Sequence, residues 1–203
     1  MDKHFLVRRI HSLFGIIPVG LFLLEHLFTN SFALKGAEAF NEKVEFFQSL
    51  PYLLAIEILF IFLPIVFHGV YGLWIYYLGE SNVSRYGYFR NWTYLIQRVS
   101  GLITFIFIFY HVYITRLSAI FYGVEISFAG MHESLSNPWM AAFYLIGLVA
   151  AVYHFTNGLW AFFISWGITV GPKSQRISAV LCNGLFVVLT FVGLNSLLAF
   201  ING

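Results

Sequence analysis

Five long apolar stretches, separated by short polar segments, dominate the pattern of hydrophobic positions along the chain. Each stretch is long enough to cross a bilayer as a helix, which takes about 20 predominantly apolar residues. We therefore predict an all-α fold, an integral membrane bundle of five transmembrane helices that forms a single domain over residues 1–203. The predicted helices cover residues 12–34, 51–79, 92–116, 138–170 and 177–201.

Prolines mark several of these boundaries. Pro51 and Pro138 lie near the starts of the second and fourth helices, where a missing backbone N–H costs nothing. Gly171-Pro172 predicts the end of the fourth helix. Pro64 lies inside the second helix and predicts a kink there.

Composition excludes a soluble enzyme. Of the 203 residues, 60% are hydrophobic and 10% are charged, and the mean hydropathy is +0.81, whereas a soluble domain has about 25% charged residues. The chain has no glycine-rich nucleotide-binding motif. Its single cysteine, Cys182, provides neither a disulfide framework, nor covalent haem attachment, nor ligands for an iron–sulfur cluster. The net charge of +2 does not indicate a nucleic-acid surface.

The basic residues predict the topology of the bundle. Eight lie on one side of the predicted membrane and three on the other, which predicts a cytoplasmic amino terminus and an outer carboxy terminus. The opening segment lacks a signal-peptidase cleavage pattern, so we expect a retained helix. The outer loops, 35–50 and 117–137, mix acids with aromatics and are expected to cap the bundle at the interface. The eight are Lys3, Arg8, Arg9, Arg85, Arg90, Arg98, Lys173 and Arg176, and the three are Lys35, Lys43 and Arg116.

Four histidines, one in each of the first four predicted helices, are the main chemical signal: His26, His68, His111 and His154. An ionisable residue within a membrane is costly and suggests a function, although an interhelical hydrogen bond would explain one such residue alone. Their intervals of 42, 43 and 43 residues are nearly constant. We infer that the four share one role.

The alternating helix directions place these histidines in two layers. At 1.5 Å per residue, His26 lies about 22 Å from the cytoplasmic start of its helix and His111 about 20 Å beyond Arg98, so both are in the outer half. His68 lies about 15 Å from the inner end of its helix, and His154 pairs with it by exclusion. Two histidines from different helices can fill both axial positions of one haem iron, so two layers predict two haems.

Other interpretations remain open. Zinc needs four convergent ligands, which two layers do not offer, but a chain of histidines can also relay protons. Glycines beside the histidines leave room for a flat ligand, or serve close helix packing. Arg8, Arg9 and Arg98 suit haem propionates, although topology alone explains them. The other histidines are expected at the membrane ends in solvated or headgroup roles, and they are His4, His11 and His132.

Longer segments carry a family resemblance. They are RRIHSLFGIIPVG, GAEAFN, LPIVFHGVYG, YFRNWTYLIQRVSGLITFIFIFYHVY and HFTNGLWAFFISWGITVGPKSQRIS. Over essentially its whole length the chain resembles the single-chain, five-helix, two-haem cytochrome b subunits of bacterial succinate dehydrogenases, the menaquinone-using kind of complex II. The resemblance implies a multi-pass protein of the bacterial plasma membrane that takes part in electron transport and the tricarboxylic acid cycle.

The resemblance also implies a ligand set. His68 and His154 would hold the higher-potential haem b near the cytoplasm, and His26 and His111 the lower-potential haem b near the outside. A flavoprotein subunit with FAD and an iron–sulfur subunit would dock on the cytoplasmic face and oxidise succinate, and electrons would reach menaquinone through this chain. Fumarate reductase, which runs the reverse reaction, is a close relative. An anchor with purely structural haems is a further alternative.

Two regions are candidates for quinone chemistry. Related anchors share an H-R-x-S-G signature near a quinone; here Gln97 replaces the histidine, while Arg98 and Ser100 match. Glu57 lies 11 residues before His68, close to three helical turns and therefore on nearly the same face, about 16 Å nearer the outside. It would supply protons to the quinone, or it is a hydrated interfacial acid. Glu25, beside His26, is a weaker candidate.

Overall fold

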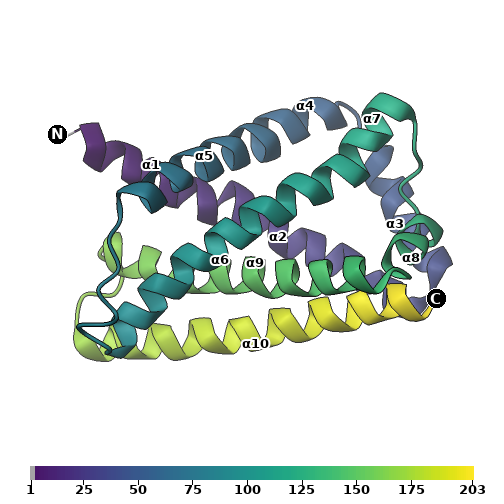
Figure 1. Cartoon of the computed structure of the whole chain (residues 1–203). Coiled ribbons are helices and arrows are strands. Elements are labelled where there is room, and N and C mark those ends of the chain that lie inside the picture. Colours follow the sequence, from purple (N-terminus) through teal and green to yellow (C-terminus); the bar gives the residue numbers. More distant parts are fainter. Residues whose placement is uncertain (1–2) are drawn as a thin grey trace.

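The computed structural model describes residues 3–203, and each regular element in that range is a helix. Five spans are long and apolar enough to cross a membrane, which confirms the predicted five-helix membrane bundle (Figure 1). The chain is a multi-pass membrane protein. The spans are His4–Lys35, Leu53–Leu78, Phe89–Tyr122, Pro138–Ser165 and Pro172–Asn202.

The first span begins well before the predicted residue 12. It consists of α1 (Lys3–Ile16), α2 (Pro18–Asn30) and a 3₁₀ turn, η1 (Ser31–Lys35). Hydropathy marks the part of a helix that lies in the membrane, and a helix can continue past it through charged residues with long side chains. Pro18, which has no N–H to donate, separates α1 from α2.

The second span contains an irregular turn just before Pro64. It runs from α4 (Leu53–Glu57) through a π-helical turn, η2 (Ile58–Phe62), to α5 (Leu63–Leu78). Pro64 is in the first turn of α5, so the irregularity lies just before the position at which a kink was predicted.

The third span also contains a π-helical turn. Here α6 (Phe89–Val112) leads into η3 (Tyr113–Leu117) and α7 (Ser118–Tyr122). The helix therefore continues beyond its predicted end at residue 116, because Arg116 lies within the π-turn rather than after the helix. Gly123, with φ of 68°, ends it.

The predicted junction between the last two helices was wrong. Helix α9 (Pro138–Ser165) ends five residues before the predicted residue 170, because Gly167 adopts φ of 72° and closes a Schellman motif. In this motif the Gly167 N–H donates to the Ile164 carbonyl at 3.1 Å, and the Ile168 N–H to the Phe163 carbonyl at 2.9 Å. Pro172 does not end α9; it begins α10 (Pro172–Asn202), in the first helical turn where proline is favoured.

Helix α9 is the centre of the bundle and packs against both α6 and α10 (Figure 1). Gly147, Ala150 and Ala151 are buried on α9, and such small residues let helix backbones approach closely. A side chain at Gly147 would collide with the ring of Phe107 on α6. Close packing along α9 therefore fixes where α6 lies.

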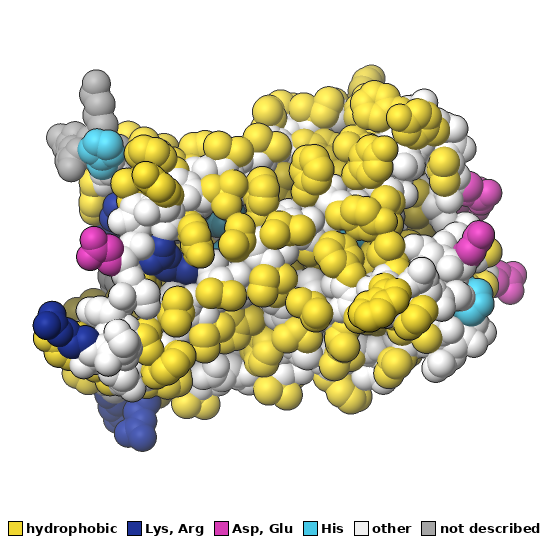
Figure 2. Space-filling view, in the orientation of Figure 1, with side chains coloured by type: hydrophobic (Ala, Val, Ile, Leu, Met, Phe, Trp, Pro, Cys, Tyr) yellow, Lys and Arg dark blue, Asp and Glu magenta, His cyan; other side chains and the backbone are white. Residues whose placement is uncertain are grey.

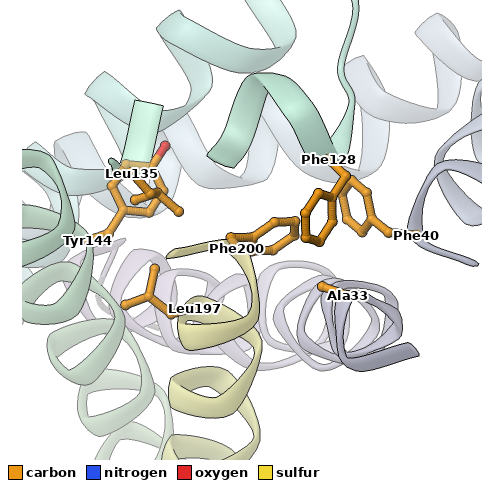
Figure 3. Packing of buried hydrophobic residues seen from close by; sticks show 7 residues of the cluster. All are labelled: Ala33, Phe40, Phe128, Leu135, Tyr144, Leu197 and Phe200. Atoms are coloured by element: carbon orange, nitrogen blue, oxygen red, sulfur yellow. The ribbon is translucent and has the colours of Figure 1, made fainter. Parts of the chain in front are cut away.

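Two short helices, α3 (Ala37–Gln48) and α8 (Phe128–Leu135), lie over the end of the bundle that carries the carboxy terminus. Figure 3 shows Phe40 of α3 and Phe128 of α8 against Phe200 of α10, with ring centres 4.9 and 5.1 Å from that of Phe200. The Asn41 side chain accepts a hydrogen bond from the Phe128 N–H at 2.8 Å. These contacts close one end of the bundle.

The two ends of the bundle differ in charge. On the face shown in Figure 2, Lys and Arg gather near the amino terminus, most Asp and Glu lie at the opposite end, and hydrophobic side chains cover the middle. We call the first, formed by residues 3–12, 79–92 and 165–176, the basic end. The second, formed by α3, α7, α8 and the carboxy terminus, is the carboxy-terminal end.

Candidate functional site

The structure brings the four intramembrane histidines together as two pairs. His68 of α5 and His154 of α9 have ring centres 6.1 Å apart and ring planes 81° apart. His26 of α2 and His111 of α6 have ring centres 5.7 Å apart and planes 71° apart. The sequence predicted the same pairs. Figure 2 shows histidine side chains in two recesses of the apolar face, one towards each end.

His68 and His154 form the basic-end pair, because His68 lies about 15 Å from the end of α5 at Leu78 and His154 about 16 Å from the end of α9. His26 and His111 form the carboxy-end pair.

The ring separations match a shared metal ion. An imidazole nitrogen binds a metal at about 2 Å, and its ring centre lies about 1 Å farther back, so two axial histidines on one iron have ring centres about 6 Å apart. Both pairs fit this separation. Among residues 3–203, no group of three or more His, Cys, Asp or Glu side chains is arranged to hold a metal ion.

The basic-end pair is oriented by the same backbone arrangement on both sides. The His68 Nδ1–H donates to the carbonyl of His11 at 2.9 Å, and the His154 Nδ1–H to the carbonyl of Gln97 at 3.0 Å. In each case a glycine four residues later, Gly15 or Gly101, leaves the space that the imidazole ring occupies. A hydrogen on Nδ1 leaves the lone pair on Nε2, which is the form of histidine that binds a metal.

The carboxy-end pair is oriented by side chains. His111 Nδ1 lies 3.1 Å from the hydroxyl of Tyr144 on α9, and the His111 ring stacks on Phe107, with centres 5.6 Å apart. Phe107 in turn fills the space left by Gly147. The His26 ring lies 5.4 Å from that of Phe22, one turn earlier on α2.

His11 lies elsewhere than the sequence predicts. It was expected in a solvated role at the membrane end, yet its ring stacks on His68 with centres 4.1 Å apart and planes 5° apart. The spacing of His11 to Gly15, which repeats that of Gln97 to Gly101, is the sequence signal that marks this position. His4 is exposed near the amino terminus, and His132 Nδ1 lies 2.7 Å from the Phe200 carbonyl at the carboxy-terminal end.

The residues of the H-R-x-S-G-like segment face the basic-end pair and its surroundings. The Gln97 side chain donates to the His154 carbonyl at 3.0 Å and accepts from Asn157 at 2.8 Å, so it joins α6 to α9. Ser100 is buried and donates to the Gln97 carbonyl at 3.1 Å. The Arg98 guanidinium donates to the Tyr76 carbonyl of α5 and lies against the Tyr76 ring.

Glu57 lies towards the carboxy-terminal end in an ion pair. Its carboxylate accepts two hydrogen bonds from Arg116, at 2.7 and 3.0 Å, and the two side chains are only 14% and 24% exposed. Glu57 directly precedes the π-turn η2, and Arg116 lies within the π-turn η3. A π-turn inserts one residue, which rotates Glu57 by roughly 100° about the helix axis, so the expected common face with His68 does not apply.

Glu25, the weaker candidate, accepts a hydrogen bond from the Thr29 hydroxyl at 2.5 Å, one turn farther along α2. This bond lies beside His26 in sequence. Glu25 thus lies within the first membrane span and is hydrogen-bonded to a residue of its own helix.

Comparisons with known proteins identify the family. A family model described as succinate dehydrogenase/fumarate reductase transmembrane subunit matches residues 82–194. The chain is 48% identical over 200 residues to the succinate dehydrogenase cytochrome b558 subunit of Bacillus subtilis (strain 168), covering 98% of both chains. The chain belongs to the succinate dehydrogenase/fumarate reductase transmembrane subunit family. It is also 26% identical to the succinate dehydrogenase hydrophobic membrane anchor subunit of Thermoplasma acidophilum, over 57% of this chain and 89% of that protein.

We expect Gly101→Leu to destabilise this member of the family, because a Cβ at Gly101 would lie 2.7 Å from Cε1 of His154. Overpacking at such a contact costs about 1–3 kcal/mol. The measurement is the free energy of unfolding of the purified protein in mixed micelles, by detergent titration. Gly184→Leu is the matched control, because a Cβ at Gly184 of α10 meets nothing within 4 Å and a change there should stay within about 0.5 kcal/mol. Equal effects of the two substitutions would contradict the contact.

Proposed function

We propose that this chain is the membrane anchor and electron-transferring subunit of a succinate dehydrogenase, in which two bis-histidine haems b connect an iron–sulfur subunit with menaquinone. The observation that carries the proposal is the pair of imidazole separations, 6.1 and 5.7 Å, each between different helices. Family membership supports the complex. Fumarate reductase anchors belong to the same family, so the physiological direction is a separate question.

The residues present suit the cofactor. His68 and His154 would hold one haem iron and His26 and His111 the other, with Nε2 of each ring as the ligand atom. Haem at these positions supplies one-electron redox chemistry within the membrane. The protein's own part is to hold the rings apart at a fixed separation, through the His11 and Gln97 carbonyls on one pair and through Tyr144 on the other.

The proton-carrier alternative has less support. A relay needs polar groups that lead from one histidine pair towards the next. In the structure, the Nδ1–H groups of His68 and His154 instead donate to backbone carbonyls, and these bonds orient the rings.

We further propose that the basic end faces the cytoplasm and binds the iron–sulfur and flavoprotein subunits. The excess of Lys and Arg at that end supports this orientation. It brings the basic-end pair nearest the electron donor.

Replacing any one of the four histidines should affect only the haem of its own pair. His68→Leu or His154→Leu should remove the basic-end haem or convert it to high spin, because an iron with one axial imidazole has an open position. Succinate-reduced and dithionite-reduced difference spectra of membranes measure both haems. His26→Leu and His111→Leu are the reciprocal controls. If His68→Leu altered the haem of His26 and left that of His154 intact, the pairing would be wrong.

A reporter active only outside the cytoplasm, fused after Gly203, should be active. An odd number of membrane crossings places the carboxy terminus opposite a cytoplasmic amino terminus. The same reporter fused after Gly171, in the loop before α10, is the control and should be inactive. The reverse result would show that the topology, and with it the order of the two haems across the membrane, is the opposite of the one proposed.

We propose that Glu57 passes protons from the outer side to menaquinone near the carboxy-end pair, its carboxylate taking up each proton before giving it to the quinone. Reduction of a quinone takes up two protons with two electrons, and general acid catalysis contributes about 10²–10⁴-fold. Glu57→Gln should therefore slow menaquinone reduction by about 100-fold or more, while haem content, assembly and succinate oxidation with an artificial acceptor are retained. The amide can still accept a hydrogen bond from Arg116, which separates the proton role from the structural one.

Menaquinone reduction at the normal rate in Glu57→Gln would leave Glu57 with the structural role alone. In that case Arg98 and Ser100 at the basic end become the quinone-binding candidates.

A further inference from the structure

A third histidine belongs to the basic-end pair. The His11 ring of α1 lies parallel to that of His68 and 5.6 Å from the ring of Tyr71. Its Nε2 atom points at Gly72 of α5, where a Cβ would lie 3.3 Å away. Helices α1 and α5 therefore pack reciprocally. The His68 ring of α5 lies against Gly15 of α1, and the His11 ring of α1 lies against Gly72 of α5.

The His11 Nε2 atom is buried and has no hydrogen-bond partner within residues 3–203. A buried polar group without a partner is unfavourable, because it has lost its hydrogen bonds to water. The carbonyl of His11 orients His68, which explains the position of the backbone but not the unpaired nitrogen. The ring therefore has a buried polar atom without a partner, next to Gly72 and one turn beyond His68 on α5.

Arg98 presents a second unpaired donor nearby. Its Nε is also buried without a partner in the described part of the chain. Its guanidinium meets α5 at Tyr76, one turn of about 6 Å beyond Gly72 towards the basic end. Two nitrogen donors thus line the same helix, one turn apart, on the basic-end side of His68.

An acidic ligand with carboxylate oxygens would satisfy both donors. A carboxylate within a membrane needs charge-assisted hydrogen bonds, and imidazole and guanidinium nitrogens provide them. Haem carries two carboxylate side chains. The inference that follows rests on the proposed function, because it assumes a haem between His68 and His154.

We propose that His11 is a haem-anchoring residue, whose Nε2–H binds a carboxylate of the haem held by His68 and His154, with Arg98 as the second anchor. His11 then acts twice on one cofactor. Its backbone carbonyl fixes the orientation of the axial ligand, and its side chain fixes the carboxylate.

The experiment compares His11→Gln with His11→Asn in the intact complex. The Gln amide nitrogen lies near the position of Nε2, whereas the shorter Asn amide lies near that of Nδ1. A donor on the carboxylate offsets its negative charge and thereby favours the reduced iron. Loss of the donor should lower the reduction potential of the basic-end haem in His11→Asn, and His11→Gln should retain most of it.

Potentiometric titration of the haem spectra measures both potentials in one sample, so the carboxy-end haem is an internal control. We expect at least a tenfold change in the reduction equilibrium of the basic-end haem in His11→Asn, which is about 59 mV for a one-electron couple. His4→Phe, an exposed change on the same helix, should move neither potential.

His11→Phe tests whether stacking on His68 is the real contribution. Our proposal predicts that it lowers the potential as His11→Asn does, because it keeps the ring but removes the donor. An unchanged potential in either His11→Phe or His11→Asn, or an equal shift in His11→Gln, overturns the proposal. If neither the Phe nor the Asn variant assembles, Arg98→Met must lower the same potential for the proposal to stand. A wild-type complex without two haems would instead refute the proposed function.

Discussion

Imidazole rings inside a membrane need partners for their polar nitrogens, and this requirement organises the bundle. Each imidazole has two nitrogens, and in hydrocarbon neither can turn to water. For His68 and His154 a backbone carbonyl accepts from Nδ1, and for His111 the Tyr144 hydroxyl lies beside it. In the proposed function, the Nε2 atoms of each pair bind one ligand between two helices.

This solution depends on glycine. A helix carbonyl already accepts from the N–H four residues later, so a second donor must approach from the side, where a Cβ at that later residue would block it. Gly15 and Gly101 stand at these positions. A glycine also positions the carboxy-end pair, but indirectly. Gly147 leaves space for the Phe107 ring, and that ring stacks on His111. The close packing of α9 thus serves both pairs.

The sequence predicted the membrane spans and the histidine pairs because both follow from simple periodicities. A long apolar run is needed wherever a helix is surrounded by lipid, so such runs mark the spans. The nearly constant interval of about 43 residues between the histidines matches one span plus one connection. The end of α9 at Ser165 was missed because the Schellman motif closed by Gly167 is a backbone feature, and the sequence stays largely apolar to Val170. His11 was missed because its burial arises from α5, a helix that is distant in sequence. The π-turns carry no compositional signal.

The two ends of the bundle use similar polar residues differently, and this bears on where a quinone binds. At the basic end the Gln97 amide hydrogen-bonds to His154 and Asn157 of α9. Ser100 is buried against the same turn. At the other end, two π-turns bring Glu57 and Arg116 together from different spans. π-Turns are costly and frequent at functional sites, which supports the Glu57 end as the quinone-reducing one. An anchor built this way would take electrons at one face and use them near the other.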